Sequence, residues 1–297
     1  MGVMATLQPI LTVARAREKH WVGDAFLVST VFSPNQLDPQ ILSPFLLMDH
    51  AAPKYFPPAT KARGVGEHPH RGFETVTFAY AGEVAHRDSH GGGGIIGPGD
   101  VQWMTAGSGV VHEEFQSERF TAEGGTFEMV QLWVNLPARL KMTSPRYQGL
   151  EGQRFPRIPF GHGVEGRLIA GDLQSLQGPA LTHTPITLFD VDFEAASTAQ
   201  FELAAGTTTL LFVLRGSVRT QRAQIAQQGD LVVLDRASRG SVELEGETGA
   251  RVLVLNGEPL EEPVFAHGPF VMNTRAEIVE AIHDYQRGLM GTLAPTS

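Results

Sequence analysis

Short stretches in which apolar side chains alternate with small or polar ones occur along most of this chain and predict β-strands. Between Trp21 and Phe32 the apolar groups of Phe26 and Val28 stand at alternate positions, and Phe45 to His50 is a more continuous apolar run. Alternate side chains of an extended strand point to one face, so the first pattern fits a half-buried strand and the second a buried one.

The same pattern continues through the first half of the chain and predicts an all-β domain there. Further strands are expected at Phe73 to Tyr80, Val84 to Asp88, Val101 to Thr105 and Thr126 to Asn135, with turns at Gly82 and at Pro98-Gly99-Asp100. Glycine (33 residues) and proline (19) are frequent while strongly helical stretches are few, which is typical of short strands joined by tight turns.

Two proline-rich segments are expected to be irregular. Pro53 to Gly66 is predicted to be a loop, and Leu136 to Pro145, with prolines near both ends, is predicted to be the linker between two domains. A chain of 297 residues is long enough for two domains. We therefore expect residues 1–140 to form an N-terminal metal-binding domain and residues 141–297 a C-terminal domain.

The second half repeats part of the first, which indicates an internal duplication. Phe78 to Val84 and Phe212 to Val218 share the pattern Phe-x-x-x-Gly-x-Val, and each is followed by a Gly-Asp pair and an apolar strand. An ungapped alignment places Glu202, Ala204, Val242 and Leu244 opposite His68, His70, His112 and Glu114. The second copy is therefore expected to lack metal ligands.

One helix is expected near the end of the chain, at about residues 274–290. Thr274 and Glu277 have the spacing of a capping box, and Gly288 or Gly291 is a candidate stop. An apolar stripe at helical spacing follows the cap and consists of Ile278, Ile282, Tyr285 and Leu289. We expect this stripe to dock on the β core and assign no chemistry to it.

Composition excludes several classes of function. Lys and Arg total 23 against 32 for Asp and Glu, so the net charge of −9 gives no general attraction to nucleic acid or anionic lipid. Without cysteine, redox chemistry has to come from a metal or another cofactor. No apolar run approaches the roughly 18–20 residues of a membrane helix, and the first residues lack a secretory pattern, so a cytoplasmic location is expected.

Candidate chemistry is concentrated in residues 68–114. His68 and His70 project from one face of a predicted strand, and so do His112 and Glu114, which gives two halves of one metal site. Three imidazoles and a carboxylate suit a divalent iron, copper, nickel or manganese ion that keeps open positions for substrate. The two halves have to meet in space for this site to exist.

Other polar residues of the same region allow different interpretations. Glu74 lies four residues beyond His70 and is a rival ligand, or a group that orients an imidazole from outside the ligand shell. His86, Asp88 and His90 also alternate, but they lead directly into four glycines and are interpreted as a polar strand end entering a flexible turn.

Three segments resemble the pirin family of bicupins. They are His68 to Val76, Pro98 to Gly107 and Gly268 to Thr274, and the resemblance extends over nearly the whole chain. It implies two stacked cupin β-barrels, of which the first holds a mononuclear iron and the second is metal-free. The family's ligand positions fall on His68, His70, His112 and Glu114, which leaves Glu74 outside the ligand shell.

The resemblance implies two different functions, and the sequence does not separate them. Some pirins are quercetinases, iron-dependent dioxygenases that open the ring of a flavonol with dioxygen and release carbon monoxide. In that case the flavonol is expected to bind the metal through its deprotonated 3-hydroxyl, with Glu114 as the candidate catalytic base. Other members are regulators that bind a transcription factor or a metabolic enzyme, and there the metal has a structural or redox-sensing role.

Overall fold

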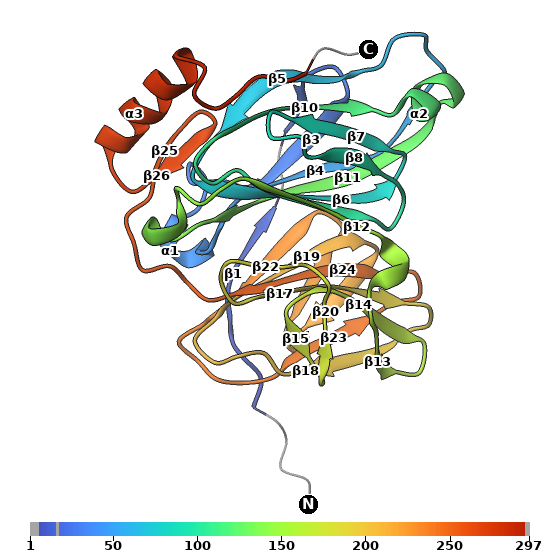
Figure 1. Ribbon diagram of the computed structural model, residues 1–297. Helices are drawn as coiled ribbons and strands as arrows, with labels where there is room; N and C mark the ends of the chain where they lie inside the picture. Colours follow the sequence, from blue (N-terminus) through green and yellow to red (C-terminus); the bar gives the residue numbers. More distant parts are fainter. Residues whose placement is uncertain (1–5, 16–17, 295–297) are drawn as a thin grey trace, which may run out of the picture. The chain divides into compact units, whose positions relative to one another are not determined.

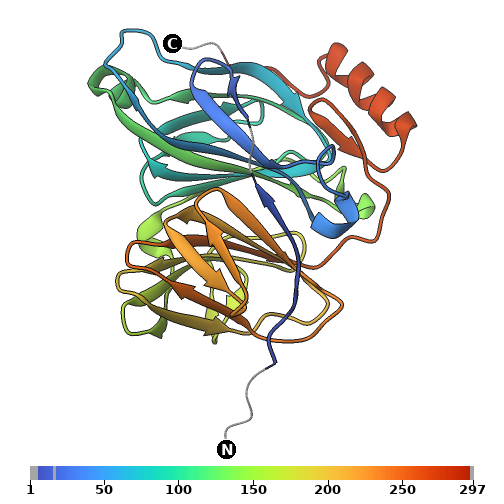
Figure 2. The same ribbon diagram turned by 180° about the vertical axis from the view of Figure 1, so that it is seen from behind.

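The computed structural model describes residues 6–15 and 18–294, and the chain forms two compact units, each assembled from segments that are distant in sequence. Unit 1 comprises Met1–Ala16, Gln40–Pro44 and Arg154–Pro259, whereas unit 2 comprises Arg17–Pro39, Phe45–Gln153 and Leu260–Ser297. Strands dominate both units (Figures 1 and 2). This confirms the all-β prediction.

Unit 2 contains a seven-stranded sheet in the order β12-β9-β6-β11-β4-β3-β2 and a four-stranded sheet in the order β5-β10-β7-β8. Its strands are β2 (Lys19–Val22), β3 (Phe26–Phe32), β4 (Phe45–Phe56), β5 (Gly64–His70), β6 (Phe73–Ala81), β7 (Val84–Asp88), β8 (Gly93–Ile96), β9 (Val101–Thr105), β10 (Val110–Gln116), β11 (Gly125–Asn135) and β12 (Arg146–Leu150). The helix α2 (Glu118–Glu123) and the 3-10 turns η1 (Ala138–Leu140) and η2 (Gly152–Arg154) complete this part of the chain.

Unit 1 repeats this construction, with a seven-stranded sheet in the order β1-β22-β19-β24-β17-β14-β13 and a four-stranded sheet in the order β18-β23-β20-β21. Its strands are β1 (Ile10–Arg15), β13 (Arg157–Gly161), β14 (Val164–Ala170), β17 (Ile186–Phe193), β18 (Ser197–Phe201), β19 (Thr208–Arg215), β20 (Ser217–Thr220), β21 (Gln224–Gln227), β22 (Asp230–Leu234), β23 (Val242–Gly246) and β24 (Arg251–Gly257). A small hairpin of β15 (Asp172–Leu173) and β16 (Leu176–Gln177) is added, and a short helix α1 (Pro39–Leu42) precedes β4.

The strand register confirms the internal duplication. Phe78 on β6 lies opposite Val101, and Phe212 on β19 lies opposite Leu231. Each partner is the first residue after the aspartate of a Gly-Asp turn, so the two repeats match residue for residue at this point.

The first strand and the last segment of the chain each belong to the unit that is formed mainly by the other half of the sequence. Strand β1 pairs with β22 in unit 1, in the sheet position that β12 takes beside β9 in unit 2. The C-terminal hairpin of β25 (Phe265–His267) and β26 (Phe270–Met272), with the helix α3 (Arg275–Gln286), belongs to unit 2. A single division at residue 140 therefore does not describe the units, because backbone pairing holds β12 and the last segment in unit 2.

Two predicted boundaries differ from the structure. The segment between Trp21 and Phe32 is two strands separated by a turn at Gly23, which has a φ of +60°. The expected loop at 53–66 is shorter, because β4 continues to Phe56 and β5 begins at Gly64. Pro53 is tolerated in β4 because the pairing register with β11 shifts between Ala51 and Lys54, where a bulge does not need its missing N–H.

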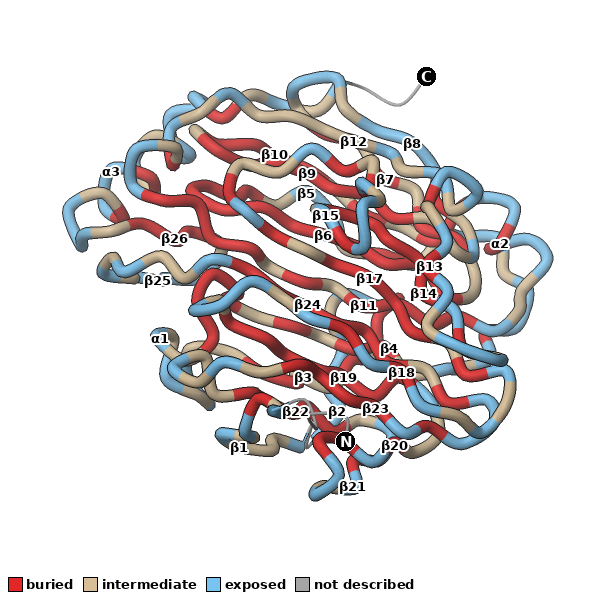
Figure 3. Tube along the Cα trace, turned by 90° about the horizontal axis from the view of Figure 1, so that it is seen from below, coloured by how far each residue is buried: buried red, intermediate tan, exposed pale blue. Residues whose placement is uncertain are grey.

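The strand pairing in the two units also corrects the ungapped alignment of the two halves of the sequence. Val110 at the start of β10 pairs with His70, and Val242 at the start of β23 pairs with Phe201. The positions that match His68, His70, His112 and Glu114 are therefore Ala199, Phe201, Leu244 and Gly246, rather than those of the ungapped alignment. Ala199, Phe201 and Leu244 are buried in the apolar core of unit 1. Figure 3 shows which parts of the chain are buried.

The C-terminal helix α3 has the predicted start. Thr274 caps it and forms a capping box with Glu277. The predicted stripe is only partly correct, because Ile278 is buried and Ile282 packs against the same apolar cluster, whereas Tyr285 and Leu289 are exposed. Among residues 6–15 and 18–294, no helix has the length and apolar character needed to cross a bilayer.

We expect Leu244→Ala to lower the free energy of unfolding of unit 1 by about 2–5 kcal/mol, because it leaves a cavity in a closed core. Ile225→Ala is the control, since Ile225 is 48 % exposed and lies on the same four-stranded sheet. Urea unfolding followed by circular dichroism measures both. Equal losses in the two variants would contradict the packing described for Leu244.

Candidate metal centre

Strands β5 and β10 pair in the smaller sheet of unit 2 (Figure 1). Three imidazoles meet at this pairing. His112 lies directly opposite His68, and their ring centroids are 4.2 Å apart. The ring of His70 is 4.8 Å from that of His112 and 4.9 Å from that of His68. The two predicted half-sites are thus brought together by antiparallel pairing.

Each of these imidazoles has its Nδ1 engaged elsewhere. The Nδ1 of His68 lies 2.8 Å from the carbonyl oxygen of Gly66, and that of His70 lies 3.3 Å from the carbonyl oxygen of Pro269. A carbonyl oxygen only accepts hydrogen bonds, so both Nδ1 atoms carry the proton and both Nε2 atoms keep a lone pair. This is the tautomer in which Nε2 binds a metal.

His112 supplies the observation that best tests whether a metal fits. Its Nδ1 lies 3.2 Å from the Nδ1 of His86, while its Nε2 is buried and has no hydrogen-bond partner. A buried nitrogen without a partner costs free energy unless a ligand binds it. The ligand atoms of His68, His70 and His112 lie within 4.8 Å of one another, which suits a shared cation.

Burial keeps His70 and His112 neutral. The pKa of His70 and that of His112 are both well below the usual value of 6.5, first because the rings are buried and then because neighbouring imidazoles would repel a second charge. Neutral imidazoles retain the lone pairs that a metal requires.

Glu114 lies in a closed ring of polar side chains. Its Oε1 accepts a hydrogen bond from Gln102 (2.6 Å), and its Oε2 accepts one from Gln131 (3.3 Å). Thr77 closes the ring, because its hydroxyl donates to Gln131 (2.6 Å) and accepts from Gln102 (3.1 Å). The carboxylate is therefore fixed in position, and it also groups with His86 and His112 as a second set of candidate ligands.

His86 and Asp88 are part of this cluster, which sequence reasoning missed. Strand β7 pairs with β10, so that Asp88 lies opposite His112 and His86 opposite Glu114. Both are buried, and the ring of His86 stacks on Tyr147 at 4.9 Å. The strand does end at Asp88 and enter a glycine-rich turn as predicted, but His86 and Asp88 are buried in the cluster, and His90, in the turn, is exposed. The alternation of His86 and Asp88 in the sequence could have indicated that both side chains belong to the cluster.

Glu74 lies outside both groups of candidate ligands. It is fully buried, and its Oε1 accepts a hydrogen bond from the hydroxyl of Thr105 at 2.6 Å. Burial raises the pKa of Glu74 to about 7. The carboxyl is therefore partly protonated near neutral pH, and the role of a rival ligand is not supported.

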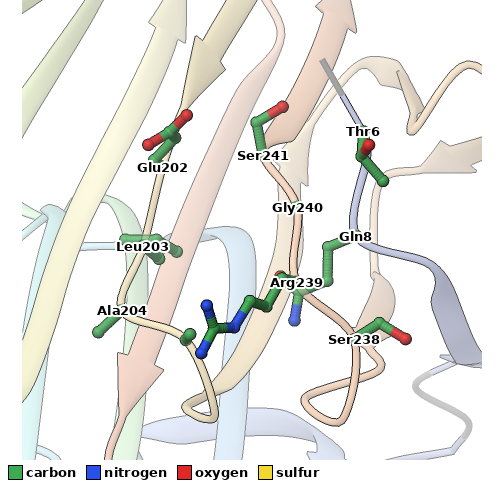
Figure 4. Close-up of a pocket in the computed structure, with 10 residues that line it drawn as sticks. Thr6, Gln8, Glu202, Leu203, Ala204, Ser238, Arg239, Gly240 and Ser241 are labelled. Carbon is green, nitrogen blue, oxygen red and sulfur yellow. The ribbon is translucent and has the colours of Figure 1, made fainter.

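Each unit has a cavity near the positions compared above. One of about 350 Å³ borders Tyr147 and Asp88, beside the histidine cluster. Another of about 320 Å³ lies in unit 1, where Figure 4 shows Arg239, Glu202 and Ser241 around it. Within the described residues, no group of three potential metal-binding side chains lies in this second cavity.

Comparison with known proteins decides the family. The model of the pirin family matches residues 25–134, and the model of the pirin C-terminal cupin domain matches residues 188–291. A human pirin is 35% identical over 254 residues, which cover 84% of this chain and 83% of that protein. The chain belongs to the pirin family. The predicted bicupin fold is thereby confirmed.

Two similar bacterial proteins carry the name of an activity. A Pseudomonas aeruginosa protein, named provisionally as a quercetin 2,3-dioxygenase, is 50% identical over 283 residues, which cover 95% of this pirin and 98% of that protein. The crystal structure of a quercetin 2,3-dioxygenase from Acinetobacter baumannii has a TM-score of 0.93 and 47% identity, and covers 97% of this chain and 100% of that one.

We expect His70→Ala to remove most of the metal from a protein that otherwise carries about one ion per chain, because a strong donor and its fixed orientation are lost. His90→Ala is the control, since His90 is exposed and outside the cluster. Elemental analysis measures the metal, and circular dichroism is expected to show both variants folded. Two ions per wild-type chain would contradict a single centre.

Glu74 predicts a dependence of stability on pH. Its pKa is about 7 in the folded protein against an ordinary 4.5, so the folded state binds the proton more tightly. Stability should therefore fall as pH rises from about 4.5 to about 7, by roughly 3 kcal/mol for this group. Glu74→Gln keeps an oxygen that accepts from Thr105 and should remove that decline. Urea unfolding at pH 5 and pH 8 tests it, and parallel profiles would contradict it.

Proposed function

We propose that this pirin is an iron-dependent dioxygenase that opens the ring of a flavonol such as quercetin. The observation that carries the proposal is the buried, unpartnered Nε2 of His112 beside His68 and His70, with the Glu114 carboxylate close by. The two relatives named as quercetin 2,3-dioxygenases support the substrate class.

The proposed ligands are His68, His70, His112 and Glu114. A divalent iron held by them supplies Lewis acidity and redox chemistry for the reaction between a flavonol and dioxygen. The Nδ1 contacts of His68 and His70 hold the two rings in the tautomer that presents Nε2. Phe73 and Trp133 pack against His70 and limit the water around it.

Glu114 is the proposed base that accepts the proton of the flavonol 3-hydroxyl. Each of its oxygens accepts one amide hydrogen bond and keeps further lone pairs, so Gln102 and Gln131 orient the carboxylate without saturating it. Glu114 would thus serve both as a ligand and as the base. The two amide donors hold its carboxylate in place for both roles.

We expect Glu114→Gln to lower flavonol turnover by about 10²–10⁴-fold, because an amide does not accept a proton at neutral pH. Metal content should stay within a few fold, since three histidines remain. Glu113→Gln is the matched control, because the neighbouring Glu113 side chain forms an ion pair with Arg87 and is not in the cluster. Oxygen uptake and carbon monoxide release with quercetin measure turnover.

The outcomes separate the two functions that the sequence left open. If Glu114→Gln keeps its iron and turns quercetin over at the wild-type rate, Glu114 is not the base. If iron-loaded wild type consumes no oxygen with any flavonol, the dioxygenase proposal fails. A regulator that binds a transcription factor or metabolic enzyme is then the function to pursue.

A further inference from the structure

The last segment of the chain contacts both strands that carry the candidate metal ligands. Residues Leu260–Ser297 are assigned to unit 2, and Figures 1 and 2 draw the β25–β26 hairpin and α3 beside β5. Arg71, next to His70, forms a parallel bridge with Phe270. The backbone N–H of Val271 donates to the carbonyl oxygen of Arg71 at 3.1 Å.

One contact reaches a candidate ligand directly. The carbonyl oxygen of Pro269, between the two strands of the hairpin, lies 3.3 Å from the Nδ1 of His70. The C-terminal segment therefore determines which nitrogen of His70 carries the proton. A shift of the hairpin would release that nitrogen and let the ring rotate or change tautomer.

A partly buried ion pair holds the segment at this position. Arg71 is 3% exposed, and its Nη1 lies 2.9 Å from the Oδ2 of Asp284 on α3. Its Nε donates to the carbonyl oxygen of Ser108 at 2.7 Å, in the turn that leads into β10. One guanidinium thus joins α3, the end of β5 and the start of β10.

Lys141, in the same unit, also holds the hairpin against the segment that follows His70. Its Nζ donates to the carbonyl oxygens of Gly72 (2.8 Å) and Val271 (2.9 Å) and to the side chain of Asn135 (2.7 Å). The approach at Gly72 is so close that a Cβ there would come within 2.0 Å of the Val271 carbonyl oxygen. Only glycine allows the hairpin to lie this near the histidine strand.

The same segment also supports the strand that carries His112. Met290 packs where a Cβ on Gly109 would stand, and it belongs to an apolar cluster with Val111. The hydroxyl of Ser89 donates to the Met290 carbonyl oxygen (2.7 Å) and accepts from the N–H of Val111 (3.0 Å). Neighbours of both His70 and His112 are therefore held by residues 269–290.

Unit 1 provides an internal comparison. Glu202 follows β18 as Arg71 follows β5, and Ser241 precedes β23 as Gly109 precedes β10. Among the described residues of unit 1, the chain near this place includes a short backbone contact between Ser241 and residues 6–8, beside the open cavity of Figure 4. In unit 2 the corresponding place is next to the histidines and is contacted by the longer segment 269–290.

We propose that the C-terminal segment is a positioning element for the metal centre, in which Asp284 and Arg71 hold the Pro269 carbonyl against His70. This inference rests on the proposed metal site, but not on flavonol turnover. Contacts of this kind around a ligating histidine change metal affinity by about 10–100-fold. Asp284 and Arg71 are positioning residues, because they act through His70.

The test compares Asp284→Asn with Glu280→Gln. Both remove one negative charge from α3, but Glu280 is exposed and lies on the helix one turn before Asp284. Co(II) is titrated against a competing chelator, and its visible absorption spectrum reports the ligand geometry. We expect Asp284→Asn to weaken Co(II) binding about 10–100-fold and to alter the spectrum. Glu280→Gln should match the wild type.

A second measurement uses the metal-free protein. Long-range ¹H–¹⁵N spectra of the imidazoles should show His70 protonated at Nδ1 in the wild type and a mixture of tautomers in Asp284→Asn. Thr274→Ala controls for stability, because it removes the cap of α3 without touching Arg71, and it should lower the melting temperature while leaving the tautomer and the spectrum unchanged.

The outcomes distinguish the two proposals. If wild type gives no Co(II) spectrum with histidine ligation, the metal centre itself is overturned. If wild type binds Co(II) and Asp284→Asn keeps its affinity, spectrum and His70 tautomer, the positioning role is overturned. Should Asp284→Asn fail to fold, Arg71→Lys is used, because a lysine keeps the charge but not both fixed contacts, and the same loss is expected.

Discussion

The antiparallel pairing of β5 with β10 is the constraint on which the site depends. His68 lies opposite His112, so the backbone ladder determines how the imidazoles meet before any metal is bound. A shift of that register by one residue would turn one set of side chains to the other face and separate the rings. Strand pairing creates this arrangement, and other hydrogen bonds then fix it. They are made at the Nδ1 of His70, at the carboxylate of Glu114, and at Arg71 and Gly72.

The two units show what the same scaffold does with and without polar residues at these positions. Ala199, Phe201 and Leu244 take the places of the three histidines in unit 1 and join a continuous apolar core. In unit 2 the same places hold imidazole nitrogens, of which the buried Nε2 of His112 has no partner. Burial of such a group opposes folding, and a bound ligand would offset that cost.

Alternation along single strands was enough to predict the β fold and the two half-sites, and the capping-box spacing of Thr274 and Glu277 was enough to predict the start of the C-terminal helix. Alternation was not enough for His86, whose place beside His112 depends on the pairing of β7 with β10, which is not visible in either strand alone. The ungapped alignment of the halves failed for a related reason, because loops of different length separate equivalent strands. The assignment of the terminal segments to the units could not be predicted either. It depends on the pairing of strands such as β1 and β22, which are far apart in sequence and share no local pattern.

The position of β1 has a consequence for how the chain is made. This strand is synthesised more than 200 residues before its partner β22, and unit 2 combines segments before residue 154 with residues from 260 onward. Unit 1 therefore cannot close before β22 has been made, and unit 2 cannot close before its last segment has been made. Such long-range closure slows folding and leaves strand edges exposed to other chains in the meantime. Because each unit combines segments from both halves of the sequence, neither half contains a complete unit.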